Sequence, residues 1–179
     1  MQFINNMYCS LHEKKHSLFY LEENKKQFFS SCFEKIAKET ELLKSDKFIQ
    51  HGDTSCLWHS IAVAYYSYCF FNTFKLKCDE KSLLYGALLH DYFLYDWHEN
   101  DKSHNLHGFR HPKTALKNAQ QHYELNAIEI DIIKNHMFPL TLTPPHHKES
   151  IMVSIFDKIC STYETFNRNT YTKLKSALR

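Results

Sequence analysis

The sequence has 179 residues, a length that fits one domain with a sizeable hydrophobic core. Its 22 basic and 20 acidic residues give a formal net charge of +2, which argues against a strongly basic nucleic-acid-binding surface. Only 3 glycines and 4 prolines accompany 43% hydrophobic residues, so the composition favours packed helices over a sheet of many strands.

The cysteines and the apolar runs bear on the cellular compartment. The six cysteines contain no CxxC pair and several lie in apolar runs, a pattern typical of reduced thiols in a protein core. The longest apolar stretches, such as IAVAYY, are far shorter than the ~20 residues that span a bilayer. We therefore expect a cytoplasmic protein without a membrane span and without a zinc-finger or disulfide framework.

The N-terminal quarter divides into an extension and the start of the domain. Residues 1–22 show no clear periodicity and are predicted to form an N-terminal extension, whereas residues 23–179 are expected to form a single domain. Apolar residues at helical spacing predict a first amphipathic helix over residues 23–47.

The next predicted helices place ionisable residues among apolar ones. Asp53 and Thr54 are expected to cap a second helix, in which His59 shares a stripe with core residues. A third helix is predicted after Asp79, and its second half, GALLHDYFL, is apolar nearly all round except for His90 and Asp91. These two side chains should therefore be removed from water and in need of partners.

A polar segment separates these helices from three further ones. Residues 96–110 are predicted to form a loop of a length more typical of functional loops. A fourth helix is expected to begin at His111 with Pro112 as its first helical residue. A fifth is predicted over residues 126–137, and a sixth over residues 149–166 carries Asp157 among apolar residues.

Six of these residues share a pattern that indicates a metal centre. They lie on, or at the starts of, five consecutive predicted helices, and they are His59, His90, Asp91, His111, His136 and Asp157. Imidazole nitrogens and carboxylate oxygens are ligands that divalent transition ions prefer, so one metal centre would satisfy all six. Buried groups of this kind otherwise cost several kcal/mol each.

A carboxylate has two oxygens, so Asp91 could bridge two ions. His59, His90 and Asp157 would then bind one ion, while His111 and His136 would bind the other. If the last two histidines are not ligands, the site holds one ion, and His107 is the nearest substitute for His111. His51, eight residues before His59, either lines the mouth of the site or ends a turn.

The same residues resemble a known family. The order H59S60xxVA, H90D91, H111P112, N135H136 and IFD157K158 is similar to the H…HD…H…H…D order of the HD superfamily of metal-dependent phosphohydrolases. The resemblance covers roughly residues 50–164 and includes the stretches HGDTSCLWHS, LLHDYFLYDWH and DKICSTYE, which look like those of bacterial HD-domain hydrolases. It implies an all-α HD-domain bundle of about six to eight helices with the six residues above as metal ligands.

One branch of that family is a poorer match. HD-GYP cyclic dinucleotide phosphodiesterases also have the His-Pro ligand and the asparagine-histidine pair. This chain instead has HDYFL where they have HDIGK, Met137 in place of a second histidine, and no GYP motif. These departures argue against cleavage of cyclic di-GMP.

The resemblance implies a phosphohydrolase with two divalent ions of Mn, Fe, Co, Ni or Zn, acting on a nucleotide or another small phosphorylated metabolite. Asp91 would take part in catalysis as well as binding metal, and phosphate contacts or proton transfer are predicted for Lys158, Asp96, His98 and His107. Two alternatives stay open, a di-iron oxygenase built from the same ligands and a regulatory module that binds a nucleotide without turnover.

Overall fold

The computed structural model describes residues 20–96 and 107–177, which form a mostly helical structure. Its elements are α2 (Glu23–Glu39), the 3-10 helix η1 (Leu42–Lys47), β1 (Ile49–His51), β2 (Thr54–Ser55), α3 (Cys56–Thr73), α4 (Glu80–Leu89), α5 (His107–Gln120), α6 (Ala127–Asn135), α7 (Lys148–Phe166) and α8 (Thr172–Ala177). The prediction of an all-α fold is confirmed. The division into an extension and one domain stays a prediction, and residues 1–19 lie outside the described part of the chain.

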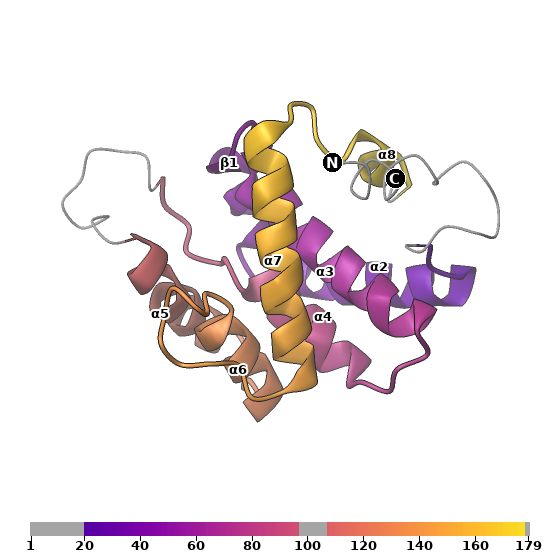
Figure 1. Ribbon diagram of the computed structural model, residues 1–179, viewed down its shortest axis with the longest axis horizontal. Coiled ribbons are helices and arrows are strands. Elements are labelled where there is room, and N and C mark those ends of the chain that lie inside the picture. Colours follow the sequence, from indigo (N-terminus) through magenta and orange to yellow (C-terminus); the bar gives the residue numbers. More distant parts are fainter. Residues whose placement is uncertain (1–19, 97–106, 178–179) are drawn as a thin grey trace.

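In the view of Figure 1, helix α7 crosses the front of the molecule at its centre, with α5 and α6 on one side and α2 and α8 on the other. It packs against α3 and α6, while α4 packs against both α3 and α6. Helix α3 is apolar around its whole circumference, and 14 of its 18 residues are buried. A helix of this kind is expected at the centre of a bundle, which explains why His59 is fully buried.

The first predicted helix is interrupted. Helix α2 ends at Glu39, Thr40 is extended, and a separate 3-10 helix follows, so a continuous helix over residues 23–47 is wrong. The Thr40 hydroxyl donates to the carbonyl of Ile36 and accepts from the N–H of Leu42, and the Tyr92 hydroxyl accepts from the N–H of Glu41. These side chains satisfy the backbone groups that a continued helix would have paired.

The start of the second helix also differs from the prediction. Asp53 and Thr54 belong to an antiparallel β1–β2 hairpin, and the residue that caps α3 is Ser55, whose hydroxyl accepts from the N–H of Trp58. The hairpin is too short to show an alternating pattern in the sequence. It places Gln50 and His51 beside the start of α3, next to His59.

Two more helix boundaries fall away from their predicted positions. Helix α4 begins after Asp79, as predicted, and the Asp79 carboxylate caps it by accepting from the N–H of Ser82, but the helix ends at Leu89. His90 and Asp91 therefore occupy the turn after the helix instead of its second half. Helix α5 starts at His107, so Pro112 lies inside it and not at its first position; residues 97–106 of the predicted loop lie outside the described residues.

The fifth and sixth predicted helices correspond closely to α6 and α7. Asn126 caps α6 in a reciprocal arrangement with Glu129, as the preference for Asn and Glu at these positions would favour. Helix α7 has no side-chain cap from its own N-cap residue, His147. Asp131 of α6 instead accepts from the N–H groups of His146 and His147.

Asp131→Asn is expected to destabilise the protein by about 1.5–3 kcal/mol at pH 7, the range for hydrogen bonds to a charged group. Burial alone would raise the pKa of Asp131, but donors from Asn135, His146 and His147 hold it well below its ordinary value. A lowered folded-state pKa contributes stability above the unfolded-state value of 3.8, and this stability is lost as pH falls through the folded-state pKa. Urea unfolding should show the wild type losing its advantage only below about pH 4, and an advantage that stays constant down to pH 2 would contradict this.

The structure bears on two predictions about the cellular compartment, and only for the residues that it describes. The five cysteines there, Cys32, Cys56, Cys69, Cys78 and Cys160, are all free thiols, and four of the five are buried. No helix among residues 20–96 and 107–177 combines the length and the apolarity needed to cross a bilayer.

Candidate metal centre

The six predicted ligands lie together in one buried cluster. None is more than 5% exposed, and the residues concerned are His59, His90, Asp91, His111, His136 and Asp157. Three of them are helical, on α3, α5 and α7, while the others occupy the first or second position after the end of α4 or α6. Residues almost 100 positions apart in the sequence are thus brought into contact.

Asp91 lies at the centre of this cluster. Its Oδ2 atom is 3.6 Å from Nε2 of His59 and 3.4 Å from Nε2 of His90. Its Oδ1 atom is 3.2 Å from Nε2 of His111 and 3.5 Å from Nε2 of His136. Each carboxylate oxygen therefore faces a different pair of histidines.

Asp157 completes the group on one side of Asp91. Its Oδ1 atom is 3.1 Å from Nε2 of His59 and 3.8 Å from Nε2 of His90. Two groups have ligand atoms that all lie within 4.8 Å of one another, namely His59, His90 and Asp157, and His90, Asp91 and His136. Ligands about 2.1 Å from a tetrahedral ion are about 3.4 Å apart, which the measured separations approach.

The ends of two helices orient His90 and His136 in the same way. His90 and His136 are the C-cap residues of α4 and α6. The Nδ1 atom of His90 is 2.7 Å from the carbonyl oxygen of Ala87, and Nδ1 of His136 is 2.9 Å from that of Ile133. A carbonyl oxygen only accepts, so both Nδ1 atoms carry a proton and, in the neutral rings, both Nε2 atoms offer a lone pair to the site. Carbonyls at a helix end lack helical partners, so each histidine also completes its helix.

His59 is oriented by a residue that the sequence analysis did not identify. Its Nδ1 atom lies 2.9 and 3.0 Å from the two carboxylate oxygens of Glu164, which is fully buried. A signal was present in the sequence, because Glu164 follows Asp157 by seven residues and two helical turns place both on one face of α7.

The β1 strand contributes two further residues. The side-chain amide of Gln50 donates to Oδ2 of Asp91 at 2.6 Å, and the Cys56 thiol donates to the Gln50 carbonyl oxygen at 3.2 Å. The ring of His51 stands edge-on to that of His59 at 5.7 Å, so His51 borders the cluster. No helical periodicity predicts these contacts, since Gln50 lies in a strand that the sequence does not reveal.

The cluster concentrates negative charge in a buried volume. Burial alone would raise the pKa of Asp91 and of Asp157, but the surrounding histidines hold both well below their ordinary values. Burial favours the neutral form of His59, yet Glu164 and Asp157 raise its pKa well above its ordinary value. Burial lowers the pKa of His136 to about 4, so this ring is neutral at pH 7 and able to act as a ligand.

The donor set fits divalent cations. His90 Nε2 and Asp91 Oδ1 are buried, and although ionisable groups lie 3.2–3.8 Å away, neither atom makes a well-directed hydrogen bond with the described residues. Buried polar atoms left in this way are rare and costly. The Nε2 atoms of His111 and His136 are 2.8 Å apart, a separation at which two ring nitrogens must share a proton or a cation. Ions at these positions would satisfy both features.

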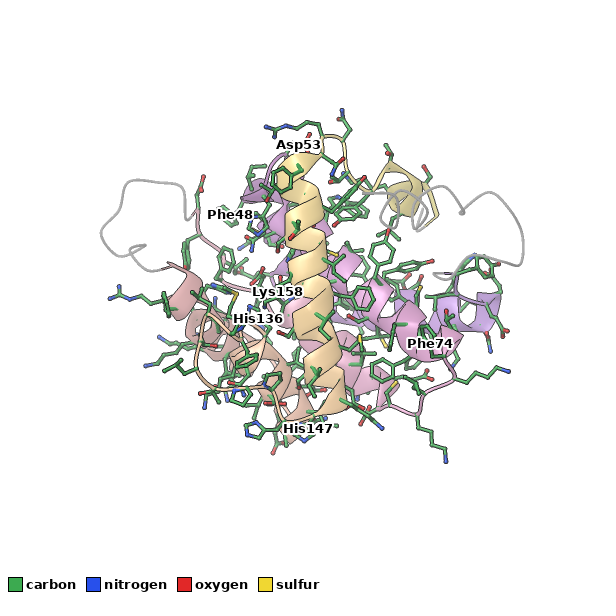
Figure 2. All side chains as sticks on the ribbon, in the orientation of Figure 1. Phe48, Asp53, Phe74, His136, His147 and Lys158 are labelled. Carbon is green, nitrogen blue, oxygen red and sulfur yellow. The ribbon has the colours of Figure 1, made fainter. Side chains whose placement is uncertain are left out.

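The remaining predicted site residues have different positions. Lys158 extends from α7 to the end of α6, where its Nζ atom donates to the carbonyl oxygen of His136 and, at 3.0 Å, to Oδ2 of Asp157 (Figure 2). Asp96 is half-buried at the end of the described loop and acts electrostatically on Cys56. His107 is the first residue of α5, but its side chain, like all of His98, lies outside the described residues.

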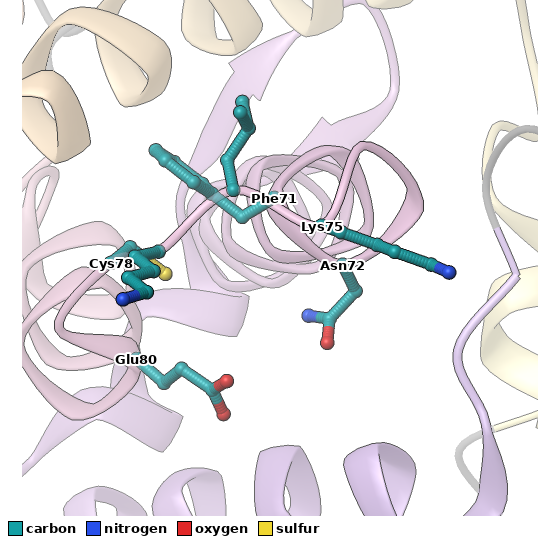
Figure 3. Close-up of a pocket in the computed structure, with 7 residues that line it drawn as sticks. Phe71, Asn72, Lys75, Cys78 and Glu80 are labelled. Carbon is teal, nitrogen blue, oxygen red and sulfur yellow. The ribbon is translucent and has the colours of Figure 1, made fainter.

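A surface pocket lies apart from this cluster. It is lined by residues of the α3–α4 connection, including Asn72, Lys75 and Glu80 (Figure 3). These residues follow the end of α3, whereas His59 lies in the first turn of that helix, so about 20 Å of helix separates them. Neither the sequence pattern nor the geometry assigns the pocket to the metal centre.

The comparisons with known proteins returned no match to any family model, curated protein or solved structure. What is shown is therefore a mostly helical protein whose buried histidine and aspartate groups could hold metal ions.

Proposed function

We propose that this protein is an HD-type metal-dependent phosphohydrolase that acts on a nucleotide or another small phosphorylated metabolite. The observation that carries the proposal is the position of Asp91, whose two oxygens face separate histidine pairs within 3.2–3.6 Å. A carboxylate placed in this way is suited to bridge two ions. The order of the six residues, which resembles that of the HD superfamily, supports the same interpretation.

Each side chain would have a defined task. His59, His90 and Asp157 would hold one divalent ion, His111 and His136 the other, and Asp91 would contact both. Bound ions of Mn, Fe, Co, Ni or Zn would supply an acidified water and positive charge for phosphoryl oxygens. The chain itself excludes bulk water, since all six side chains are buried, and it fixes the ring orientations through the Nδ1 contacts.

Lys158 would strengthen one side of this arrangement. Its ammonium group neutralises the outer oxygen of Asp157 and ties α7 to the end of α6, which carries His136. The side chain is 39% exposed, so it also borders solvent from which an anionic substrate would arrive. Contact with a phosphate group stays a prediction for Lys158, as it does for Asp96 and His107.

Purified protein is expected to contain close to two divalent ions per chain and to hydrolyse members of a panel of phosphomonoesters and phosphodiesters. Metal content would be measured by mass spectrometry, and phosphate or nucleoside release would be followed with each of the five metals. Protein that takes up no ion on reconstitution would contradict the proposal. Iron-loaded protein with an oxygen-dependent absorption signal and no hydrolysis under any metal would instead indicate a di-iron oxygenase.

A further inference from the structure

Glu164 is a buried carboxylate whose position calls for an explanation. It is 0% exposed, and ionised side chains removed from water are costly unless they are paired and hydrogen-bonded. Its partners are the Nδ1 atom of His59 and the hydroxyl of Tyr171, which donates to Oε1 at 2.5 Å. The three side chains therefore form a hydrogen-bonded series that leads directly into the candidate metal centre.

The Tyr171 end of this series is itself held in an uncommon conformation. Tyr171 has a φ of 63°, in the left-handed region that bulky residues rarely adopt, and it is 1% exposed. Its ring packs against those of Tyr66 and Tyr163, with centroids 6.4 and 6.1 Å away. Such backbone strain persists only where the surrounding structure determines the conformation.

The turn that carries Tyr171 is anchored to the β1–β2 hairpin. The carboxylate of Asp53 accepts from the N–H of Asn169 at 2.9 Å, and the hydroxyls of Thr54 and Thr170 are hydrogen-bonded. Gly52, with a φ of 61°, lies so close to the carbonyl of Glu164 that an added Cβ would collide with it. The hairpin, the end of α7 and the following turn thus converge on Glu164.

We propose that Glu164, held in place by Tyr171, is a positioning residue that fixes the orientation and tautomer of His59. Because an ionised carboxylate accepts the Nδ1 proton, Nε2 of His59 faces Asp91 and Asp157, and in the neutral form of the ring that a metal ion would require it presents a lone pair there. Glu164 acts through His59 and contacts no ion itself. This inference rests on the proposed metal centre, and it gives the C-terminal turn a role in metal binding.

Glu164→Gln is expected to weaken binding of Zn²⁺ or Mn²⁺ by about 10–100-fold, the range observed when a partner of a metal-binding histidine is removed. Glutamine keeps the shape of the side chain but lacks the negative charge and can turn a donor toward Nδ1. Tyr171→Phe should weaken binding less, because it leaves the carboxylate on His59 and removes only the hydroxyl that orients it. The affinities would be measured by competition with a coloured chelator, which requires no enzymatic activity.

Glu149→Gln provides a matched control on the same helix. Glu149 is also a buried carboxylate, 3% exposed, and it accepts a hydrogen bond from the N–H of Asp79. It lies about 20 Å along α7 from Glu164. The Glu149→Gln substitution should lower the melting temperature of the protein without changing its metal affinity. If Glu164→Gln likewise lowers only the melting temperature, the positioning role is wrong.

The outcomes for this inference and for the proposed function are separable. Wild-type protein that binds metal but hydrolyses no phosphate ester would contradict the proposed function, while a loss of affinity in Glu164→Gln would still support the positioning role. Hydrolysis by the wild type together with unchanged metal affinity in Glu164→Gln would overturn the positioning role alone.

Discussion

Asp91→Asn is expected to reduce phosphohydrolase activity by about three orders of magnitude and to reduce the number of bound ions. The loss corresponds to about 4 kcal/mol of transition-state stabilisation, as expected when metal-derived charge stabilisation is removed. Asparagine has nearly the same shape but offers one neutral oxygen where Asp91 presents two charged ones to four histidines. Initial rates and metal stoichiometry measured on the same preparation would test both effects.

Asp131→Asn is the matched control for this substitution. Asp131 is a buried aspartate, 6% exposed, that accepts several hydrogen bonds on α6, but it belongs to no metal-competent group among the described residues. Its loss should reduce stability and leave the turnover of folded protein unchanged. A nucleotide that binds Asp91→Asn and wild type equally, with no turnover by either, would instead favour the regulatory module.

The candidate site could be predicted from the sequence mainly because the residues conflict with their surroundings. His59, His90 and Asp157 each interrupt an apolar run, and a polar group in such a run needs a partner. The structure places the Nε2 atoms of His59 and His90 within 3.8 Å of Oδ1 of Asp157. Whether they bind metal stays a prediction, but their convergence required only that apolar helix faces pack together.

The predicted elements were less accurate where side chains override periodicity. The apolar residues of GALLHDYFL continue past the end of α4, so periodicity alone gave no reason to end the helix at Leu89. Proline was read at the first helical position, whereas α5 begins five residues before Pro112. Helix boundaries depend on caps and tertiary contacts that a hydrophobic pattern does not contain.

The residues that hold the candidate ligands in place were the hardest to predict from the sequence. Gln50 reaches Asp91 from a three-residue strand, and Tyr171 reaches Glu164 from a strained turn. Both contacts depend on how the hairpin and the C-terminal turn pack against the end of α7. Such contacts between distant segments leave no periodic signal. The seven-residue spacing of Asp157 and Glu164, in contrast, would have indicated that Glu164 faces the site.

Removal of bound ions by a chelator is expected to lower the melting temperature by about 8–16 °C. A ligand at about 1,000 times its dissociation constant stabilises the folded state by about 4 kcal/mol, and each kcal/mol shifts the midpoint by about 2–4 °C for a chain of this size. The physical cause is the buried charge of Asp91 and Asp157, which remain ionised because their pKa values are held well below the ordinary range. Bound divalent ions would neutralise this charge and would satisfy the Nε2 atom of His90.

The shift in melting temperature caused by metal should become smaller as the pH falls and when a metal ligand is replaced. Protons compete with the ions for the histidines and carboxylates, so the stabilisation by metal should diminish as pH falls from 7 toward 5. Calorimetry with and without Zn²⁺ should show the shift in wild type and in Asp131→Asn, and a much smaller shift in Asp91→Asn. Equal melting temperatures for loaded and chelated wild type would mean that the six residues bind no ion tightly, and their burial would then need another explanation, such as protons shared between the rings and carboxylates.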